Sequence, residues 1–494
     1  MNITPAILKC FGRPYIVGGA LRDTVLKRPF GDLDLTAEYS GDFGKRVSEL
    51  AKATGSNLFL MDAENSVWRL TGKKQHKFQI DIKPFQGGTI EEDLLNRDFT
   101  INALGMPVTA GTGIYFRPEK GSFEISAGET EIIDPSGGLK DLRAGIIRPV
   151  SKKAFTDDPL RMLRLYRLAA KLNFRISLSA AAQVKRHCAL IAKSAGERVR
   201  DEIMQTLGCP DSKKWLLRMR KSGILFSVFP ELAEQEKCAV EYYGKGGVFK
   251  HTLATVERTE ELFSDLDSYI PRYAEIGGLA PLGRPELFKF AALLHDVAKP
   301  AKATEVDGRL RFFGHEECGA IMSEKIMNRL RFSKDDINMV CGSIGEHLRP
   351  GNLAANSKIT ERALFRFYKA VGKNTVPLLL LSWADQSSYI PLALLRKSKK
   401  ELQKSPGKID LGKLSYNSYK KTFHFMQVLY LLLNTYLKKD PKNIRPLLTG
   451  NDIMEKLDIT PSPKVGKILD KLKMLQFEGK IKTRTEALEI LRTL

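Results

Sequence analysis

Cysteine pairs are missing from this chain of 494 residues, whose six cysteines are scattered without any C-x-x-C spacing. This absence argues against both a disulfide framework and a zinc knuckle, and we expect reduced thiols. Long apolar runs are missing as well, since the longest, at 376–381 and 428–433, are too short to cross a bilayer. No basic, apolar and small-residue leader precedes the first motif. The sequence therefore predicts a soluble, cytoplasmic protein that does not engage a membrane.

Acidic residues are outnumbered by basic ones. Lys and Arg total 79 against 57 Asp and Glu, which gives a formal net charge of +22 and a pI near 9.6. Residues 391–494 alone hold 22 basic and 10 acidic side chains. Such an excess favours a polyanionic partner such as RNA, although a membrane surface or a merely basic chain would give the same balance.

A glycine turn follows the first predicted strand. The apolar run Tyr15–Val17 is typical of a short buried strand, and it ends at Gly18 and Gly19. Because glycine has no side chain, backbone N–H groups at this turn can approach a phosphate. The segment is therefore a candidate cradle for a triphosphate, with a plain hairpin turn as the alternative.

Paired acids come next, in Gly31-Asp-Leu-Asp-Leu35. Asp32 and Asp34 are two residues apart, so on an extended segment both carboxylates project from one face. Two hard oxygen ligands suit Mg²⁺ and phosphoryl transfer to a hydroxyl. Asp81, in the alternating segment 78–82, is expected on a neighbouring strand, where it supplies a third carboxylate or a base. The alternative is a pair of solvated loop acids.

Further motifs follow in order along the chain. They are Asn96-Arg-Asp-Phe-Thr-Ile-Asn102, Asp134-Pro135 with Gly138-Leu-Lys-Asp-Leu142, Asp157-Asp-Pro-Leu-Arg161 with Arg164 and Arg167, and Glu197-Arg-Val-Arg-Asp-Glu202. With the glycine turn and the paired acids, this series resembles the class II nucleotidyltransferases, the family of bacterial CCA-adding tRNA nucleotidyltransferases and poly(A) polymerases. The resemblance implies a polymerase-beta-like head whose sheet is mixed.

The resemblance also implies roles for individual residues. Catalysis falls to Asp32, Asp34 and Asp81, with Mg²⁺ on the first two. Nucleotide binding falls to Gly18, Gly19, Arg22, Asp23, Arg97, Asp98, Asn102, Asp158, Arg161 and Arg164. In Arg97–Asn102 the alternating polar side chains suit phosphate and ribose hydroxyls. Asp158-Pro159 is typical of a helix N-cap followed by proline, and the family's equivalents of Asp158 and Arg161 read the edge of the incoming base.

Two departures from the family pattern bear on function. Asn96 stands where the family usually has an arginine, and Asp157 where it usually has glutamate. In addition, only Lys83 to Ile90 separates the Asp81 segment from Glu91-Glu-Asp93, where full CCA-adding members carry a long flexible loop. A shortened loop resembles the partial enzymes that add CC and stop, because the loop helps to change the site from CTP to ATP.

Histidine is scarce, and four of the chain's seven histidines belong to a second cluster. The cluster consists of His251, His295-Asp296, Lys299, His315, His347 and Asp385. Imidazole and carboxylate together suit Mn, Ni, Fe, Mg or Zn, whereas a lone buried histidine is usually a core residue. The order resembles the HD phosphohydrolase superfamily, which implies that His251, His295, Asp296 and Asp385 hold one divalent ion. His315 and His347 match additional ligands, and Lys299 a phosphate contact.

The sequence therefore predicts an α+β fold with a helical body. We expect a nucleotidyltransferase head at 1–143, a helical neck that binds base and RNA at 144–243, an HD domain at 247–390 and a basic, helical RNA-binding tail at 391–494. The segment 447–469 resembles the family's RNA-contacting tail, in which Gly466, between Lys464 and Lys467, would start or sit within a helix near phosphate; the alternative is an ordinary packed helix pair.

The predicted function is template-independent addition of CTP, with or without ATP, to tRNA 3′ ends. HD-domain phosphatase or 2′,3′-cyclic phosphodiesterase activity accompanies it, unless the HD fold is only an RNA-binding scaffold. One alternative is poly(A) polymerase, and another is an RNA-binding metal hydrolase with an inert head. The sequence leaves the oligomeric state open.

Overall fold

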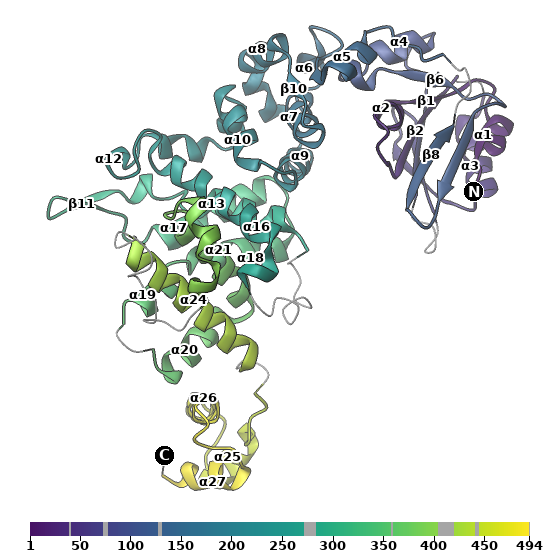
Figure 1. The fold of residues 1–494 in the computed structure, drawn as a ribbon. Helices are drawn as coiled ribbons and strands as arrows, with labels where there is room; N and C mark the ends of the chain where they lie inside the picture. Colours follow the sequence, from purple (N-terminus) through teal and green to yellow (C-terminus); the bar gives the residue numbers. More distant parts are fainter. Residues whose placement is uncertain are drawn as a thin grey trace. The chain divides into compact units, whose positions relative to one another are not determined.

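The computed structural model describes residues 1–38, 41–72, 78–126, 131–270, 283–356, 359–403, 419–439 and 444–493 (Figure 1). It divides into two compact units. The first unit comprises Met1–Ser194 and Lys221–Ser227, and the second comprises Ala195–Arg220 and Val228–Leu494.

The first unit is built on a six-stranded mixed sheet, as predicted. Its strands are β1 (Pro14–Val17), β2 (Asp32–Ala37), β3 (Asn57–Asp62), β4 (Val67–Thr71), β5 (Gln79–Pro84) and β6 (Gly105–Pro107). The strand order is β3-β4-β5-β2-β1-β6. β2 and β5 run parallel, and the other neighbouring pairs run antiparallel. Two further strands, β7 (Gly113–Arg117) and β8 (Ser122–Ser126), pair with each other in a separate antiparallel hairpin.

Helices flank this sheet and continue beyond it. They are α1 (Thr4–Cys10), α2 (Gly18–Val25), α3 (Phe43–Thr54), α4 (Ile90–Leu95), α5 (Gly138–Ala144), α6 (Ala154–Asp157), α7 (Arg161–Leu172) and α8 (Leu178–His187), with the 3₁₀ turn η1 (Thr100–Asn102) and the short parallel pair β9 (Ile146–Ile147) and β10 (Arg175–Ile176). The period-two pattern of β2 explains its placement, because Leu33 and Leu35 are buried, Asp32 is exposed and Asp34 is half-buried.

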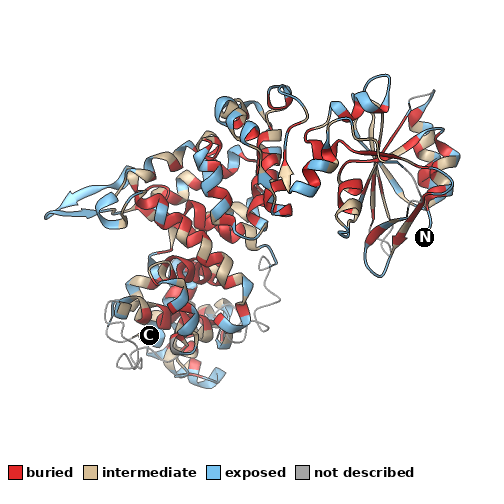
Figure 2. Ribbon diagram, turned by 45° about the horizontal axis from the view of Figure 1, so that its top comes forward, coloured by how far each residue is buried: buried red, intermediate tan, exposed pale blue. Residues whose placement is uncertain are grey.

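The second unit is helical apart from one hairpin. Its helices are α9 (Gly196–Gly208), α10 (Ser212–Lys221), α12 (Val240–Tyr243), α13 (Gly247–Ser264), α14 (Leu266–Tyr269), α16 (Pro285–Leu294), α17 (His315–Arg329), α18 (Lys334–Gly345), α19 (Arg349–Ala354), α20 (Glu361–Val371), α21 (Thr375–Ser387), α22 (Leu392–Lys397), α23 (Lys399–Leu402) and α24 (Lys420–Lys438). α13, α16, α18 and α21 pack against one another, and their inner faces are buried (Figure 2).

The hairpin joins β11 (Thr304–Val306) to β12 (Arg309–Arg311); the predicted helical body is confirmed, with this hairpin and the short β9–β10 pair as local additions to it. Its two-residue turn consists of Asp307 and Gly308, both with positive φ, at 51° and 67°. An Asp-Gly pair in this conformation is the turn that matches the twist of two antiparallel strands. The signal was therefore present in the sequence but was not recognised.

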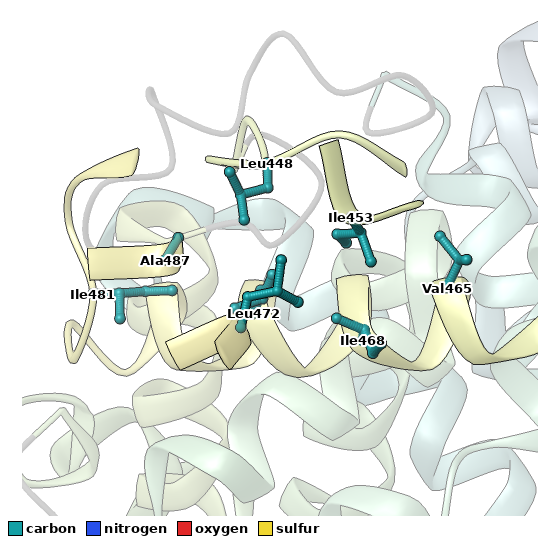
Figure 3. Close-up of a cluster of buried hydrophobic side chains, with 8 residues drawn as sticks. Leu448, Ile453, Val465, Ile468, Leu472, Ile481 and Ala487 are labelled. Atoms are coloured by element: carbon teal, nitrogen blue, oxygen red, sulfur yellow. The ribbon is translucent and has the colours of Figure 1, made fainter. Parts of the chain in front are cut away.

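Residues 444–493 form a small helical module with its own core. α25 (Gly450–Leu457), α26 (Pro463–Phe477) and α27 (Arg484–Arg492) enclose the buried side chains drawn in Figure 3, among them Ile453, Ile468 and Leu472. Capping boxes at Thr449 and Thr483 begin α25 and α27. Gly466 lies inside α26, as expected for this segment. Over the described residues, no helix combines the length and apolarity that a membrane crossing requires.

We predict that Gly138→Ala destabilises the first unit. A Cβ atom on Gly138 would lie 2.1 Å from the carbonyl oxygen of Thr100, so α5 would have to move away from η1. Overpacking of this kind costs about 1–3 kcal/mol. Thermal unfolding should show a lowered midpoint, whereas Gly12→Ala, whose added atom meets nothing within 4 Å, should unfold like the wild type. Equal midpoints for both variants would contradict the packing argument.

Candidate functional site

The glycine turn lies directly against the second acid of β2. α2 begins at Gly18, whose φ of +69° is in the left-handed region. A Cβ atom there would lie 2.8 Å from Oδ2 of Asp34 and 3.0 Å from a guanidinium nitrogen of Arg97. The N–H of Gly19 donates to the same Asp34 oxygen over 3.0 Å. Glycine is therefore required at position 18 for both its conformation and its close approach to the acid.

Asp81 extends the acidic face of the sheet. β2 and β5 are parallel, and their register pairs Asp32 with Gln79 and Asp34 with Asp81. Paired residues on neighbouring strands project to the same side, as do residues two apart on one strand. Asp32, Asp34 and Asp81 consequently share one face. The expectation that Asp81 lies on a neighbouring strand is confirmed, while its chemical role remains a prediction.

Arg69 is a site residue that the sequence reading missed. It lies on β4 opposite Asp81 in the antiparallel register. Its Nε and Nη2 atoms donate to the two oxygens of Asp81, each over 2.8 Å. A bidentate pair of this kind fixes the carboxylate and offsets its charge. The contact depends on strand pairing, so no local motif marks it.

Electrostatics distinguish Asp34 from an ordinary surface acid. Burial raises the pKa of the Asp34 carboxyl, Arg97 opposes that shift, and the nearby Asp81 carboxylate adds to it, so that the net direction is upward. A carboxylate in this position is stabilised by any additional positive charge. The acidic face is therefore suited to a cation.

A chain of hydrogen bonds links α2 to α7 through η1. Arg22 donates to both oxygens of Asp23, over 2.9 and 2.7 Å, and to Oδ1 of Asn102 over 2.8 Å. Asn102 donates to Asp98 over 3.0 Å, and Asp98 pairs with Arg164 over 3.0 Å. Burial raises the pKa of Asp98, but Arg164 and Asn102 outweigh it and the net shift is downward. Five predicted nucleotide-binding residues are thus in mutual contact.

Asp93, on α4, anchors Arg97 and was also missed by the sequence reading. Its carboxylate is fully buried and pairs with Arg97 over 3.0 Å and with Lys83 over 3.1 Å. Burial raises the pKa of Asp93, yet Arg97 and Lys83 reverse the shift and hold it below the ordinary value. Asp93 therefore keeps Arg97 beside Gly18 and Asp34.

The prediction that Asp158 caps a helix is wrong. α7 begins at Arg161 with Leu160 in the capping position, and no side chain caps it. Asp158 instead accepts from the Leu160 N–H over 3.1 Å, while Arg161 donates to the Asn96 carbonyl over 3.0 Å. Pro159 allows a tight turn to precede the helix, which moves the helix start beyond the predicted position.

A cleft of about 450 Å³ gathers most of these side chains within the first unit. Among the predicted residues it is lined by Gly19, Arg22, Asp23, Asp32, Asp34, Asp81, Asn102 and Arg164. Gly18, Arg97 and Asp98 do not line it directly: Gly18 and Arg97 lie beside the lining residue Asp34, and Asp98 pairs with the lining residue Arg164. Asp158 and Arg161 are not among the described residues that line it. Asp32, Asp34 and Asp81 line the sheet side of the cleft, and Arg164 and Arg167 line it from α7.

The donor set of this cleft fits a divalent cation. Asp32 and Asp34 offer oxygen ligands on one face, and the Gly18 position leaves backbone rather than a side chain beside Asp34. Oxygen donors in small number, with room for substrate phosphates and water, are what Mg²⁺ prefers.

A second site lies in the helical unit. His251 projects from α13, Asp385 from α21, and His295 and Asp296 directly follow α16, which begins at Pro285 as predicted. Nε2 of His251 lies 3.0 Å from Oδ1 of Asp385 and 3.4 Å from Oδ2 of Asp296. Nε2 of His295 lies 3.2 Å from the same Asp296 oxygen. The structure therefore brings together the predicted group of four ligands.

The two additional histidines approach from the other side of Asp296. Nε2 of His315 lies 3.5 Å, and Nε2 of His347 3.9 Å, from Oδ1 of Asp296. His251, His295 and Asp385 form one group able to hold a metal ion, and Asp296, His315 and His347 form another. All six side chains are buried. The arrangement allows one or two divalent ions.

Each histidine is oriented by the nitrogen that faces away from the cluster. Nδ1 contacts the carbonyl of Ala292 for His295, of Phe312 for His315 and of Ile344 for His347, at 2.7 to 2.8 Å. Nδ1 of His251 instead contacts the hydroxyl of Ser388 at 3.1 Å. These contacts place the Nδ1 protons on the outside and direct Nε2 lone pairs inward, as in metal-binding histidines.

The cluster is also electrostatically prepared for a cation. Burial raises the pKa of Asp296, but His295 and Lys299 overcome it and hold the pKa well below its ordinary value. Burial lowers the pKa of His347 to about 4, which keeps that ring neutral. Both oxygens of Asp296 and Nε2 of His315 are buried without a hydrogen bond of good geometry. Buried lone pairs in this condition fit a metal ion.

Lys299 and Tyr243 close one side of the HD cluster. Nζ of Lys299 lies 2.6 Å from Asp296 and donates to the Tyr243 hydroxyl over 3.1 Å. The rings of Tyr243 and Tyr389 stack on His251, with centroids at 5.2 and 5.0 Å. The sequence reading missed both tyrosines, because no local motif marks the stacking of either ring on His251.

Comparison with known families agrees with this division of chemistry. The model of the poly A polymerase head domain matches residues 14–148, a model described as the probable RNA- and SrmB-binding site of polymerase A matches residues 173–236, and the HD domain model matches residues 248–390. The fold and the acidic cleft thus define a nucleotidyltransferase with a polymerase-beta-like head. The chain carries the poly A polymerase head domain and the HD domain, and it is similar to A-adding and CC-adding tRNA nucleotidyltransferases.

Two similar proteins span nearly the whole chain. One is the A-adding tRNA nucleotidyltransferase of Deinococcus radiodurans, 28% identical over 96% of this chain and 93% of the relative. Another is the CC-adding tRNA nucleotidyltransferase of Geobacter sulfurreducens, 28% identical over 96% of this chain and 90% of the relative. The solved CCA-adding enzyme of Thermotoga maritima with tRNA has the same fold, with a TM-score of 0.55, 19% identity and coverage of 99% and 93%.

We predict that the purified full-length protein retains a divalent metal at the HD cluster. After loading with Mn²⁺ or Ni²⁺ and dialysis, elemental analysis should find at least one ion per chain. His295→Ala should lose that ion, because the ring supplies Nε2 to the cluster. His187→Ala, on α8 outside the cluster, is the matched control. Equal metal content in both variants would contradict the assignment.

Proposed function

We propose that this protein is a template-independent nucleotidyltransferase that adds CTP to the 3′ ends of tRNA. The observation that carries the proposal is the row of Asp32, Asp34 and Asp81 on two parallel strands, facing a turn where only glycine fits. A terminal RNA hydroxyl attacks the α-phosphate of the nucleotide, the new O–P bond forms, and pyrophosphate leaves. Mg²⁺ bound to Asp32 and Asp34 would neutralise phosphate charge and orient these oxygens.

The chain's own residues divide the remaining work. Gly18 and Gly19 let backbone approach the triphosphate, and Arg97, held by buried Asp93, adds positive charge beside it. Asp81 serves as a third carboxylate or accepts the hydroxyl proton, while Arg69 holds it in place. The network from Arg22 to Arg164 supports a fixed cleft wall for ribose and base.

Base selection is assigned to the start of α7. Asp158 and Arg161 together offer an acceptor and a planar fork of donors, which suits recognition of a base edge. In the structure Arg161 donates to a backbone carbonyl, that of Asn96, and that contact has to be exchanged when a base is bound. Arg164, which lines the cleft beside Asp98, is the companion cation.

The connection from β5 to α4 supports addition of CC alone. It consists of residues 85–89, and it is held at several points. The Gln86 N–H donates to Asp93 over 3.1 Å, and the Gly88 N–H donates to Glu92 over 2.6 Å. Gly87 has a φ of +109°, and a Cβ atom there would lie 2.6 Å from Glu92. A short, anchored turn does not have the length to change the site from CTP to ATP.

The RNA partner and location follow from the same proposal. The second unit ends in a basic module, and residues 391–494 carry 22 basic against 10 acidic side chains. This excess suits the backbone of tRNA. The six cysteines form no disulfide bond in the structure, which is consistent with the proposed cytoplasmic location.

A second candidate function is metal-dependent phosphohydrolysis at the HD cluster. It is favoured by six buried candidate ligands, Asp296 among them, and by Lys299, whose ammonium lies 2.6 Å from Asp296 and can contact a substrate phosphate. Mn, Ni, Fe, Mg or Zn would supply Lewis acidity and an activated water in this position. RNA 3′ ends that carry a phosphate or 2′,3′-cyclic phosphate are the proposed substrates.

We predict that the enzyme stops after two additions. With Mg²⁺, CTP and ATP, tRNA that lacks CCA should be extended by two C residues and no A, because the anchored turn at 85–89 cannot reorganise the site. The products are separated at single-nucleotide resolution, with tRNAs ending in C and in CC as further primers. Addition of A to the CC-ended tRNA would contradict CC-only addition, and long A tails on unrelated RNA would indicate a poly(A) polymerase.

We predict that Asp32→Asn abolishes incorporation without abolishing RNA binding. Removal of a metal ligand costs several kcal/mol of transition-state stabilisation, so the rate should fall by about 10³-fold or more. Glu49→Gln, an exposed acid on α3, removes the same charge and should leave the rate unchanged. Incorporation is measured with radiolabelled CTP and binding by filter retention of tRNA. Absence of incorporation by the wild type would support the alternative of an inert head.

A further inference from the structure

A groove of about 800 Å³ lies beside the HD cluster, between α12 and the β11–β12 hairpin. Its walls include Tyr242 and Tyr243 on α12 and Arg309, Arg311 and Phe312 at β12. Its charged lining residues are three cations and one acid, since Lys237 joins the two arginines and Glu241 is the acid. The groove therefore combines aromatic faces with a positive potential.

Two wall residues of the groove, Tyr243 and Phe312, contact residues of the HD cluster. Nζ of Lys299 lies 5.5 Å from the ring centroid of Tyr243 and 5.6 Å from that of Phe312, and it donates to the Tyr243 hydroxyl. The same ammonium is 2.6 Å from Asp296. The Phe312 carbonyl contacts Nδ1 of His315 at 2.7 Å. Only the Lys299 side chain therefore separates the groove walls Tyr243 and Phe312 from the predicted metal ligand Asp296.

The hairpin is built as a surface feature. Every residue from Lys302 to Arg311 is exposed, and the hairpin stands out in pale blue from the helices of its unit in Figure 2. A two-stranded hairpin that buries none of its side chains gains little stability from packing. Its rigid Asp307-Gly308 turn nevertheless fixes the strand register. The side chains of the hairpin therefore have fixed relative positions and are exposed, so that another molecule can bind to them.

The two arginines of β12 are available for a ligand. Arg309 and Arg311 are two residues apart on one strand, so both project from the same face. Neither forms an ion pair with any residue that the structure describes, whereas Arg284, Arg329 and Arg396 of the same unit are each paired with an acid. Two unpaired guanidinium groups at this spacing suit successive phosphates of a chain.

Two exposed aromatic rings accompany these arginines: Tyr242 lines the groove, and Phe313 directly follows the lining residue Phe312 in sequence. Tyr242 is 73% exposed and Phe313 is 72% exposed, which is far more than large aromatic side chains usually are. Aromatic faces beside a cationic track are the two elements by which single-stranded nucleic acid is held without sequence preference. A protein partner would be expected to need a continuous apolar patch, and the arginines interrupt it.

We propose that this groove binds the single-stranded end of an RNA and directs its terminal phosphate to Lys299 and the HD cluster. Bases stack on Tyr242 and Phe313, and Arg309 and Arg311 contact the preceding phosphates. The proposal rests on the phosphohydrolase function suggested above, for which it supplies the substrate class. The groove thereby selects a polynucleotide end in preference to a free nucleotide.

The test uses a short, fluorescently labelled RNA that ends in a 3′-phosphate. Its binding to the full-length protein is measured at low temperature and over a range of salt concentrations. Arg309→Ala/Arg311→Ala should weaken binding about tenfold or more and reduce the salt slope by about 1.4, the value for two single-strand phosphate contacts. Tyr242→Ala should weaken binding about tenfold, through loss of one stacking platform. Arg309→Lys/Arg311→Lys should restore the salt slope, because it restores both charges.

The control is Arg362→Ala/Arg366→Ala, which removes the same charge from exposed positions on α20. Photo-cross-links from a 4-thiouridine in the RNA should map to the segments around Tyr242 and Phe313. Unchanged affinity and salt slope in the Arg309 and Arg311 variant, cross-links elsewhere, or competition by a nucleoside 3′-monophosphate as strong as that of RNA would each overturn the proposal.

Hydrolysis of bis-p-nitrophenyl phosphate, which has no base, separates this proposal from the phosphohydrolase function. If the metal-loaded wild type does not cleave that diester but the groove variants lose RNA affinity, the hydrolase function fails and the binding surface stands. If the wild type cleaves it but the groove variants bind RNA as the wild type does, the hydrolase function stands and the groove proposal fails.

Discussion

The parallel pairing of β2 with β5 is the constraint on which the first unit depends. It places Asp34 beside Asp81, and repulsion between neighbouring carboxylates in a partly buried site is on the order of several kcal/mol. The surrounding residues offset that cost: Arg69 holds Asp81, and the Gly19 N–H and Arg97 face Asp34. These groups do not fully compensate the negative charge on this face, because the pKa of the Asp34 carboxyl remains raised. The fold therefore maintains a site whose stability improves when cations and phosphates bind together.

The HD cluster uses the reverse arrangement. Here one fully buried acid, Asp296, lies among imidazole nitrogens and an ammonium group, and these hold its pKa well below the ordinary value. Backbone carbonyls and a serine hydroxyl engage the Nδ1 atoms, so the Nε2 atoms have no freedom to turn outward. In both sites backbone groups help to fix the direction of the functional side chains. In both, a metal ion would balance negative charge on the carboxylates.

The sequence predicted those features whose signals are local. Alternation in 32–35 and 78–82 indicated two strands with their acids on one face, and the apolar run after Pro285 indicated the helix that ends at His295. Features that depend on pairing between distant segments were not predictable in this way. Arg69 meets Asp81 only through the antiparallel register of β4 with β5, and Tyr389 stacks on His251 only after α21 packs against α13. The start of α7 was misplaced because Pro159 favours both a helix start and a preceding turn.

Asp93 explains how loop length and site geometry are coupled. Its buried carboxylate accepts from the Gln86 N–H in the turn that follows β5, and it also pairs with Lys83 and Arg97. Arg97 in turn lies against Gly18 and near Asp34. Displacement of the turn would therefore remove the Gln86 N–H from the buried Asp93 carboxylate, at a cost of about 1–3 kcal/mol. It would also disturb Arg97, which Asp93 holds at the nucleotide site. A long loop could move without drawing on this anchor, whereas a five-residue connection tied to it cannot. Under the proposed addition of CC alone, nucleotide choice follows from where the buried Asp93 carboxylate finds its partners, because the anchored turn keeps one specificity through successive additions.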